Sequence, residues 1–317
     1  MNQPFSRRTF LRTLSGAAVA SVMARSTSAT SPFARFAAPV TAASPDIRIG
    51  YASITWGGKA RQAIDDISAV GYRGIQLRSD DIKQFQPTAL RDELRQKNLE
   101  FVALSSGNVH IDPASHDSDI ATHTANATYM RDAGGHFLQV IDQEPHQKDF
   151  SASDYKYFGG LLTDLGKRTS DIGIPLVYHN HLNSVSEHPE GLVKVFDAVD
   201  PEYVKLLFDI AHYQAGGGDP VKGIAQFKEH LALLHIKDLG KPLDLPADDP
   251  KRLEDFVELG RGGVNIPGVF DALREIKFHG WAIVELDSEI DKSRTPKDSA
   301  EISKAYLQQK LGIDVGR

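Results

Sequence analysis

Residues 152–181 read ASDYKYFGGLLTDLGKRTSDIGIPLVYHNH and contain one complete step from a helix to a strand. Apolar residues at helical spacing predict a helix that ends at Gly173, because glycine is a common helix terminator. The short apolar run from Pro175 onward predicts a buried strand. That strand ends in His179, Asn180 and His181, which form either an ordinary polar loop or the mouth of an active site.

The same alternation of strand and helix continues on both sides of this unit. Apolar strand candidates start at residues 47, 74, 100, 136, 175, 204, 231 and 281, and a helical pattern follows each of them. This order predicts an α/β fold, a (β/α)8 TIM barrel, as a single catalytic domain over residues 46–317. A doubly wound sheet is the alternative, but residues 54–63 (ITWGGKARQA) lack the G-x-G-x-x-G spacing that follows the first strand in such sheets.

The N-terminal residues carry an export motif that does not belong to the barrel. SRRTFL at residues 6–11 resembles a twin-arginine signal, followed by a modest apolar stretch and by small residues suited to cleavage. We therefore expect a twin-arginine signal peptide over residues 1–29, a flexible spacer over residues 30–45, and a periplasmic or secreted protein. A basic amphipathic helix is the alternative interpretation of this segment.

Composition and charge exclude several classes of site and partner. The chain contains no cysteine, so disulfides, cysteine-rich zinc sites and thiol catalysis are excluded. Loss of residues 1–29 removes four arginines and no acid, which changes the formal net charge from −6 to −10. An acidic chain without a basic run is a poor match for nucleic acid. No apolar stretch after the signal is long enough to span a membrane, so we expect no membrane partner once the signal is removed.

Side chains that bind metals stand at the ends of four consecutive predicted strands. The fifth strand ends at His179, the sixth at Asp209, the seventh around His235 and the eighth at Glu285. Each residue alone has an ordinary interpretation, as a hydrogen-bonded core histidine or as the cap of the following helix. The ends of neighbouring parallel strands lie about 4.8 Å apart, so the four side chains are expected to converge. Burying them together without a counter-ion would be costly.

A divalent cation would offset that cost. Imidazole and carboxylate together suit one Mn²⁺, which is the ion that we expect, with Zn²⁺, Co²⁺, Fe²⁺ or Mg²⁺ as alternatives. Without cysteine, a metal that accepts water and substrate oxygens is favoured over a closed structural zinc. The sequence thus predicts a metal centre on His179, Asp209, His235 and Glu285.

Four short motifs resemble a known family. They are YHNH (178–181), FDIAH (208–212), HIKD (235–238) and GWAIVELD (280–287). As a set they are similar to the sugar isomerase/epimerase-like family of xylose isomerase-like TIM barrels, also called AP endonuclease family 2. The resemblance extends from about residue 47 to the end of the chain and is strongest over residues 175–287. It implies a divalent metal on the same four residues and a small-molecule sugar or keto-sugar as substrate.

One departure from the family pattern bears on the reaction. The resemblance implies a glutamate at the end of the fifth strand in ketose epimerases, paired with the glutamate of the eighth strand, whereas this chain has His179 there. The histidine-rich end is more similar to inosose dehydratases and related keto-sugar lyases. There, the resemblance implies, a metal polarises a ketone and a base removes the adjacent proton.

The hypothesis is therefore a divalent-metal-dependent sugar or keto-sugar lyase, dehydratase or isomerase. A ketose or keto-glycoside epimerase and a noncatalytic sugar-binding barrel are the alternatives, and a homo-oligomer is compatible with the sequence. An endonuclease IV-like phosphodiesterase is disfavoured by the acidic charge. The long segment 239–262 is expected to be a lid or specificity loop.

The remaining candidates are side chains expected to act on the substrate. The catalytic candidates are His181, His212 and Glu285. The candidates for substrate binding are Trp56 after the first strand, Arg78 at the end of the second, and Lys237 in the HIKD motif. Histidine suits proton transfer because its unperturbed pKa is about 6.5.

Overall fold

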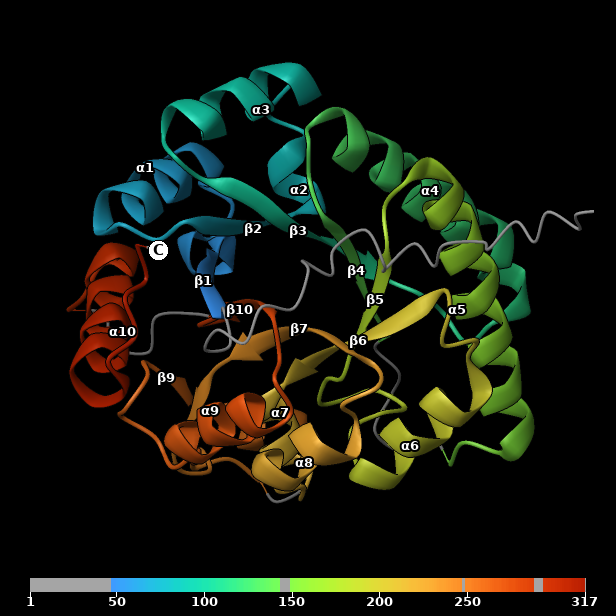
Figure 1. The fold of residues 1–317 in the computed structure, drawn as a ribbon. Coiled ribbons are helices and arrows are strands. Elements are labelled where there is room, and N and C mark those ends of the chain that lie inside the picture. The colour runs from blue at the N-terminus through green and yellow to red at the C-terminus, as the bar shows by residue number, and fades with distance from the viewer. Residues whose placement is uncertain (1–46, 143–148, 247–248, 288–292, 317) are drawn as a thin grey trace, which may run out of the picture. The chain divides into compact units, whose positions relative to one another are not determined.

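The computed structural model describes residues 47–142, 149–246, 249–287 and 293–316 (Figure 1). Eight parallel strands in these residues close into a barrel in the order β1-β10-β7-β6-β5-β4-β3-β2. Their bounds are β1 Ile47–Ala52, β2 Gly74–Arg78, β3 Glu100–Asn108, β4 Phe137–Ile141, β5 Leu176–His179, β6 Val204–Asp209, β7 Leu231–Ile236 and β10 Gly280–Val284. The predicted (β/α)8 TIM barrel is confirmed. The predicted signal peptide (1–29) and spacer (30–45) lie outside the described residues.

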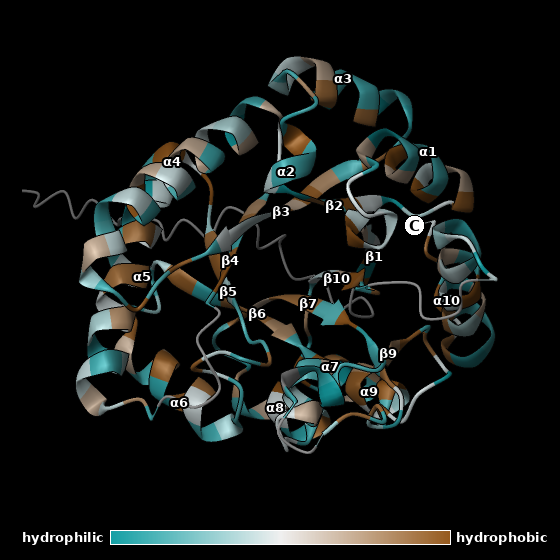
Figure 2. Cartoon of the chain, turned by 180° about the vertical axis from the view of Figure 1, so that it is seen from behind, coloured by the Kyte–Doolittle hydropathy of each residue, from teal (hydrophilic) through white to brown (hydrophobic). Residues whose placement is uncertain are grey.

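Helices follow the strands and lie around the outside of the barrel (Figure 1). Their bounds are α1 Ala60–Val70, α2 Ser79–Ile82, α3 Pro87–Gln96, α4 His116–Asp132, α5 Ala152–Ile172, α6 Pro189–Ala198, α7 Ile210–Ala215, α8 Pro220–Gln226, α9 Ile266–Glu275 and α10 Pro296–Leu311. Figure 2 shows hydrophobic residues along the strands and a mixture of both kinds on the helices, as expected for helices with one packed face. Among the described helices, none has both the length and the hydropathy needed to cross a membrane.

Local sequence signals explain where α5 begins and ends. Ser151 and Asp154 form a capping box at its start, in which each side chain accepts a hydrogen bond from the other residue's backbone N–H. Gly173 ends the helix with a φ of 93°, in the left-handed region that glycine enters without steric cost. The chain then passes directly into β5, as the sequence predicted.

The barrel interior is divided into an apolar layer and a polar layer. Successive side chains of a strand point to opposite sides of the sheet, so Val177 and His179 share one face of β5, and Leu233 and His235 share one face of β7. A cluster of buried apolar residues forms the lower layer: Val102, Phe137, Val177, Leu207, Leu233, Trp281 and Ile283. The polar side chains follow two residues later, toward the C-terminal ends of the strands, which is where barrel enzymes carry their chemistry.

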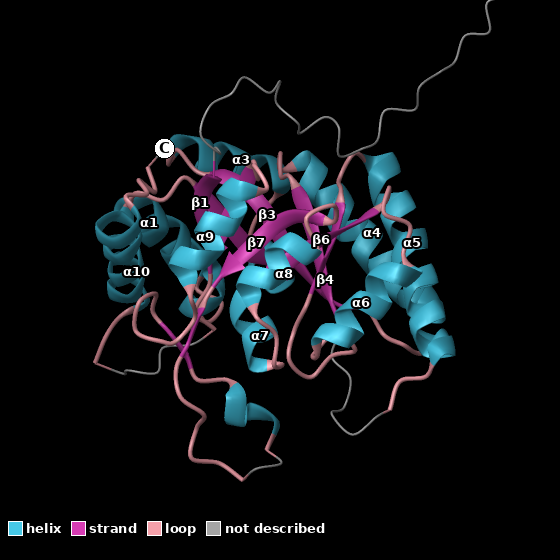
Figure 3. Ribbon diagram, turned by 60° about the horizontal axis from the view of Figure 1, so that its bottom comes forward, coloured by secondary structure: helices cyan, strands magenta, loops and turns pink. Residues whose placement is uncertain are grey.

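The segment after β7 is anchored at both ends instead of forming a plain loop. Asp238–Leu239 (β8) pairs in antiparallel orientation with Phe256–Val257 (β9). The Asp238 carboxylate also accepts hydrogen bonds from the backbone N–H groups of Gly260, Gly262 and Val264. Figure 3 shows the rest of this segment projecting away from the barrel. The sequence did not predict the hairpin, because each of its strands has only two residues.

Candidate active site

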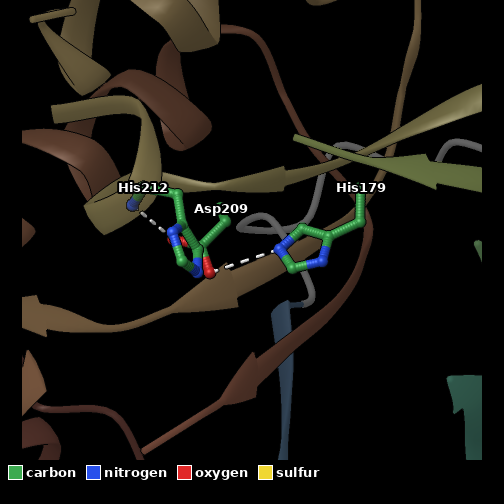
Figure 4. A group of neighbouring side chains, drawn as sticks. All are labelled: His179, Asp209 and His212. Atoms are coloured by element: carbon green, nitrogen blue, oxygen red, sulfur yellow. Dashed lines mark hydrogen bonds and ion pairs between the residues drawn. The ribbon is translucent and has the colours of Figure 1, made fainter. Parts of the chain in front are cut away.

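The four predicted metal ligands lie together at the C-terminal ends of their strands. His179 ends β5, Asp209 ends β6, His235 lies in β7 and Glu285 directly follows β10. All four are buried. Asp209 Oδ2 lies 3.4 Å from His179 Nε2 and 3.6 Å from His235 Nδ1, and Glu285 Oε1 lies 3.3 Å from His235 Nδ1. The convergence that the strand ends predicted is therefore present, and Figure 4 shows Asp209 between His179 and His212.

Asp209 is held in place by the backbone around it. Its Oδ1 accepts hydrogen bonds from the N–H groups of Ala211 and His212, so it caps helix α7. The side chain of Asn180 bonds both the N–H and the C=O of Asp209, which ties the end of β5 to the end of β6. Oδ2 remains directed at the centre. The pKa of Asp209 is lowered well below its usual value, because the nearby cationic groups, Lys237 foremost, outweigh the effect of burial.

His235 has one nitrogen that faces two carboxylates. Its Nε2 bonds Gln76 Oε1 at 2.9 Å, whereas Nδ1 is buried and forms no hydrogen bond with any described residue. Burial alone would lower the pKa of His235, but the charges of Glu285 and Asp209 outweigh it and raise the pKa to about 9. A buried nitrogen between two carboxylates is a position for either a proton or a cation.

The donor set fits a divalent metal ion. The ligand atoms of Asp209, His235 and Glu285 all lie within 4.8 Å of one another. Two carboxylates and one imidazole suit Zn²⁺, Mn²⁺, Co²⁺ or Fe²⁺. A second group of the same kind joins His179, Asp209 and His212 through the shared carboxylate.

Lys237 lies in the middle of the carboxylates. Its Nζ is 2.8 Å from Glu285 Oε1, 3.0 Å from Asp287 Oδ1 and 3.4 Å from Asp209 Oδ2, and the side chain is fully buried. Burial would lower the pKa of Lys237, but these three carboxylates raise it well above its usual value. The side chain therefore carries a positive charge next to the predicted metal ligands.

His181 and His212 form a stacked pair beside this centre. Their ring centroids are 3.8 Å apart with planes tilted by 35°. Nδ1 of His181 donates to the carbonyl of Leu182 at 2.6 Å, and Nδ1 of His212 accepts from the N–H of the same residue at 3.3 Å. Burial, with the nearby cationic groups, lowers the pKa of His181 to about 4 and that of His212 well below its usual value. Both imidazoles are therefore neutral near pH 7, and Nε2 of His181, whose Nδ1 carries the hydrogen, is available as a proton acceptor.

Residues 64–310 match the family described as "Xylose isomerase-like TIM barrel". The chain belongs to the xylose isomerase-like TIM barrel family. Inosose dehydratase of Geobacillus kaustophilus (strain HTA426) is 24% identical to it over 293 residues, which cover 83% of this chain and 94% of that protein. A rhizopine catabolism protein, MocC, of Rhizobium meliloti is 26% identical over 77% of this chain and 82% of its own length.

Solved structures of the family share the fold. The IolI protein, whose structure holds a zinc atom, superposes with a TM-score of 0.70 at 19% identity, over 85% of this chain and 98% of that one. D-allulose 3-epimerase from Methylomonas sp. gives a TM-score of 0.68 at 20% identity, over 84% of this chain and 99% of that one. These similarities show a common barrel fold, which by itself does not determine the reaction.

Two of the predicted substrate-binding residues, Trp56 and Arg78, have very different surroundings in the structure. Trp56 is only 3% exposed, packs edge-on against Tyr51, and donates from Nε1 to Asp66 at 2.9 Å, so it is part of the core. Its face is not open for stacking on a sugar. Arg78 is exposed at the end of β2, and its contact with a substrate stays a prediction.

The structure adds three residues that the sequence had not singled out. Gln76 and Gln139 stand on the inside of β2 and β4 and are buried. Phe256 comes from the segment after β7; its ring packs against His212 at 4.8 Å, and the Lys237 ammonium lies 4.5 Å from its centre. The sequence could have indicated the two glutamines, because each is a polar residue within an apolar strand. It could not have indicated Phe256, because β9 is too short to be predicted.

Proposed function

We propose that this protein is a divalent-metal-dependent enzyme that removes a proton next to a carbonyl group of a sugar or keto-sugar, as a dehydratase or related lyase. The observation that carries this proposal is the buried Nδ1 of His235, which lies 3.6 Å from Asp209 Oδ2 and 3.3 Å from Glu285 Oε1. The relatives named inosose dehydratase support the class of substrate and reaction.

The side chains divide into ligands and groups that handle protons. Asp209, His235 and Glu285 would hold the ion, and His179, the fourth residue that the sequence predicts, contacts Asp209 beside them. Bound there, a divalent cation would polarise a substrate carbonyl and acidify the neighbouring C–H group. Neutral His181 would accept the proton at Nε2, with His212 stacked beside it.

Elimination also needs a donor for the departing oxygen. The Lys237 ammonium lies 3.2 Å from His212 Nε2, so this proton donor stands beside the pair of His181 and His212. We propose that Lys237 binds the departing oxygen. Asp287, 3.0 Å from Lys237, would orient it.

The choice of dehydratase over epimerase rests on the end of β5. Two opposed carboxylates would serve an epimerase, but β5 supplies His179, and Glu285 alone faces it from the other side of the barrel. We further propose Mn²⁺ as the natural ion, and export through the twin-arginine route directed by SRRTFL (6–11). An exported enzyme would meet free sugars and keto-glycosides in the periplasm.

Metal removal tests the proposed function. We expect about one bound divalent ion per chain, and loss of at least about 10³-fold in turnover of an inosose after chelation, because the ion would supply most of the polarisation of the carbonyl. Elemental analysis and a stopped assay on an inosose, a 3-keto-glycoside and a free ketose measure both. Mn²⁺, Zn²⁺ and Co²⁺ should each restore turnover to a different degree. Full turnover after exhaustive chelation would refute metal dependence, and turnover of the ketose alone would favour the epimerase.

The affinity for metal should rise with pH. Below about pH 9 the nitrogen that faces the centre, His235 Nδ1, holds a proton that the cation must displace. We therefore expect the apparent Zn²⁺ affinity to increase by about tenfold for each pH unit from pH 6 upward, and to level off near pH 9. Calorimetric titration in buffers of different ionisation enthalpy would count the released proton. A flat affinity over this range would exclude His235 as a ligand.

A further inference from the structure

Four side chains on the inside of the barrel form one continuous chain of hydrogen bonds. His235 Nε2 lies 2.9 Å from Gln76 Oε1, Gln76 Nε2 lies 2.9 Å from Gln139 Oε1, and Gln139 Nε2 lies 3.1 Å from His179 Nδ1. All four side chains are buried, with at most 3% of each exposed. We call Gln76 and Gln139 together the amide relay. It links the outer nitrogens of the two histidines whose other nitrogens face the centre.

The amide relay has a direction, because each amide has one donor end and one acceptor end. If His235 donates from Nε2 to Gln76, then Gln76 donates to Gln139, and Gln139 donates to Nδ1 of His179. A neutral His179 then carries its hydrogen on Nε2. Reversing both amides reverses both histidines. With the relay intact and both imidazoles neutral, one histidine turns a lone pair to the centre and the other turns an N–H group to it.

The atoms that meet along the relay select the first of these two arrangements. Gln76 turns its oxygen to His235 Nε2, and Gln139 turns its amide nitrogen to His179 Nδ1. His179 Nε2 accordingly lies 3.4 Å from Asp209 Oδ2, an acceptor, and His235 Nδ1, 3.3 Å from Glu285 Oε1, is the nitrogen from which a cation would displace the proton. The group of ligand atoms with both carboxylates contains His235 and not His179. The two imidazoles therefore have different surroundings, although both lie near the C-terminal end of a strand.

We propose that the amide relay of Gln76 and Gln139 makes the two histidines unlike: His235 is a metal ligand, and His179 is a neutral N–H donor that points at Asp209 and at an oxygen bound beside it. Gln76 and Gln139 are then positioning residues. His179 replaces the predicted fourth ligand by a hydrogen-bond donor. The ligand role of His235 rests on the proposed function, whereas the position of the hydrogen on His179 does not.

Nuclear magnetic resonance of protein labelled with ¹⁵N-histidine tests the proposal directly, and H179N identifies the signals of His179. We expect a hydrogen on Nε2 and none on Nδ1, both in metal-free protein and after saturation with Zn²⁺. A purely structural role of the glutamines would not dictate this tautomer. If Zn²⁺ moves the hydrogen of His179 to Nδ1, His179 is a ligand and the proposal is wrong.

A cycle of Zn²⁺ affinities tests the relay from the other side. In Q139E, a carboxylate accepts from both Gln76 and Nδ1 of His179, so the lone pair of His179 turns to the centre as an added ligand. We expect H179N to change the affinity of the wild type by less than about threefold, and to lower that of Q139E by at least about tenfold. In each background the protein with His179 is compared with its H179N variant. The negative charge that Q139E adds is then present in both members of the pair and does not affect their ratio.

Two results of the cycle would overturn the proposal. One is a tenfold loss of Zn²⁺ affinity when H179N is made in the wild type, and the other is an equally small effect of H179N in both backgrounds. Circular dichroism and thermal unfolding of all four proteins check that the fold is kept. If Q139E does not fold, the resonance experiment is carried out on Q139M instead of the affinity cycle. If Zn²⁺ does not bind at all, the proposed function fails, but the signals of His179 in metal-free protein still test the relay.

Discussion

Replacing Glu285 with glutamine is expected to lower turnover of an inosose by about 10³-fold or more. The substitution keeps the shape of the side chain and removes one of the two carboxylates that face His235 Nδ1. The pKa of Glu285 is lowered well below its usual value, because His235 and Lys237 outweigh the effect of burial, so the side chain is ionised in the native protein. An amide binds a divalent cation far more weakly than a carboxylate does. Metal content and turnover of E285Q should therefore fall together.

Glu275 offers a matched control for that substitution. It is an exposed glutamate at the end of α9, and E275Q should retain turnover within about twofold of the wild type. Retained turnover in E285Q would contradict both roles considered for Glu285, that of a metal ligand and that of an acid or base. Sugar binding without turnover in the wild type as well would instead support the noncatalytic alternative.

Replacing Lys237 with methionine is expected to destabilise the metal-free protein by about 3–5 kcal/mol. The ammonium is fully buried and lies within 3.4 Å of oxygens from three carboxylates. Methionine preserves most of the volume but leaves Asp209 and Glu285 without their main positive partner, and burying such charges is costly. Urea unfolding in the presence of a chelator measures the loss.

Zinc and a surface lysine provide the two controls for K237M. Zn²⁺ should recover much of the lost stability in K237M, because a cation would again compensate the two carboxylates. Lys222 lies on the surface, 3.4 Å from Asp219, with 84% of its side chain exposed. The substitution K222M should therefore lower the free energy of unfolding by less than about 1 kcal/mol. A loss in K237M no larger than in K222M would show that the carboxylates do not depend on Lys237.

Much of the site was predictable because it depends on where strands end. Apolar runs place His179, Asp209, His235 and Glu285 at strand ends, and parallel strands in a closed barrel bring those ends together. The buried Lys237 was also found from the HIKD motif. Trp56 shows the limit of this reasoning: a tryptophan after a strand suits either a sugar platform or the core, and only its contacts with Tyr51 and Asp66 decided for the core.

The sequence by itself determined the barrel, the rim that carries the polar groups, and the identity of the converging side chains, because these follow from short-range periodicity. Only the tertiary structure decided which nitrogen of each histidine faces the centre. That choice depends on Gln76 and Gln139, which lie 63 residues apart in the chain, and on the bond from Gln76 to His235 across 159 residues. The direction of a hydrogen bond is a property of the pair, so no local pattern in β5 distinguishes a ligand from a donor at His179.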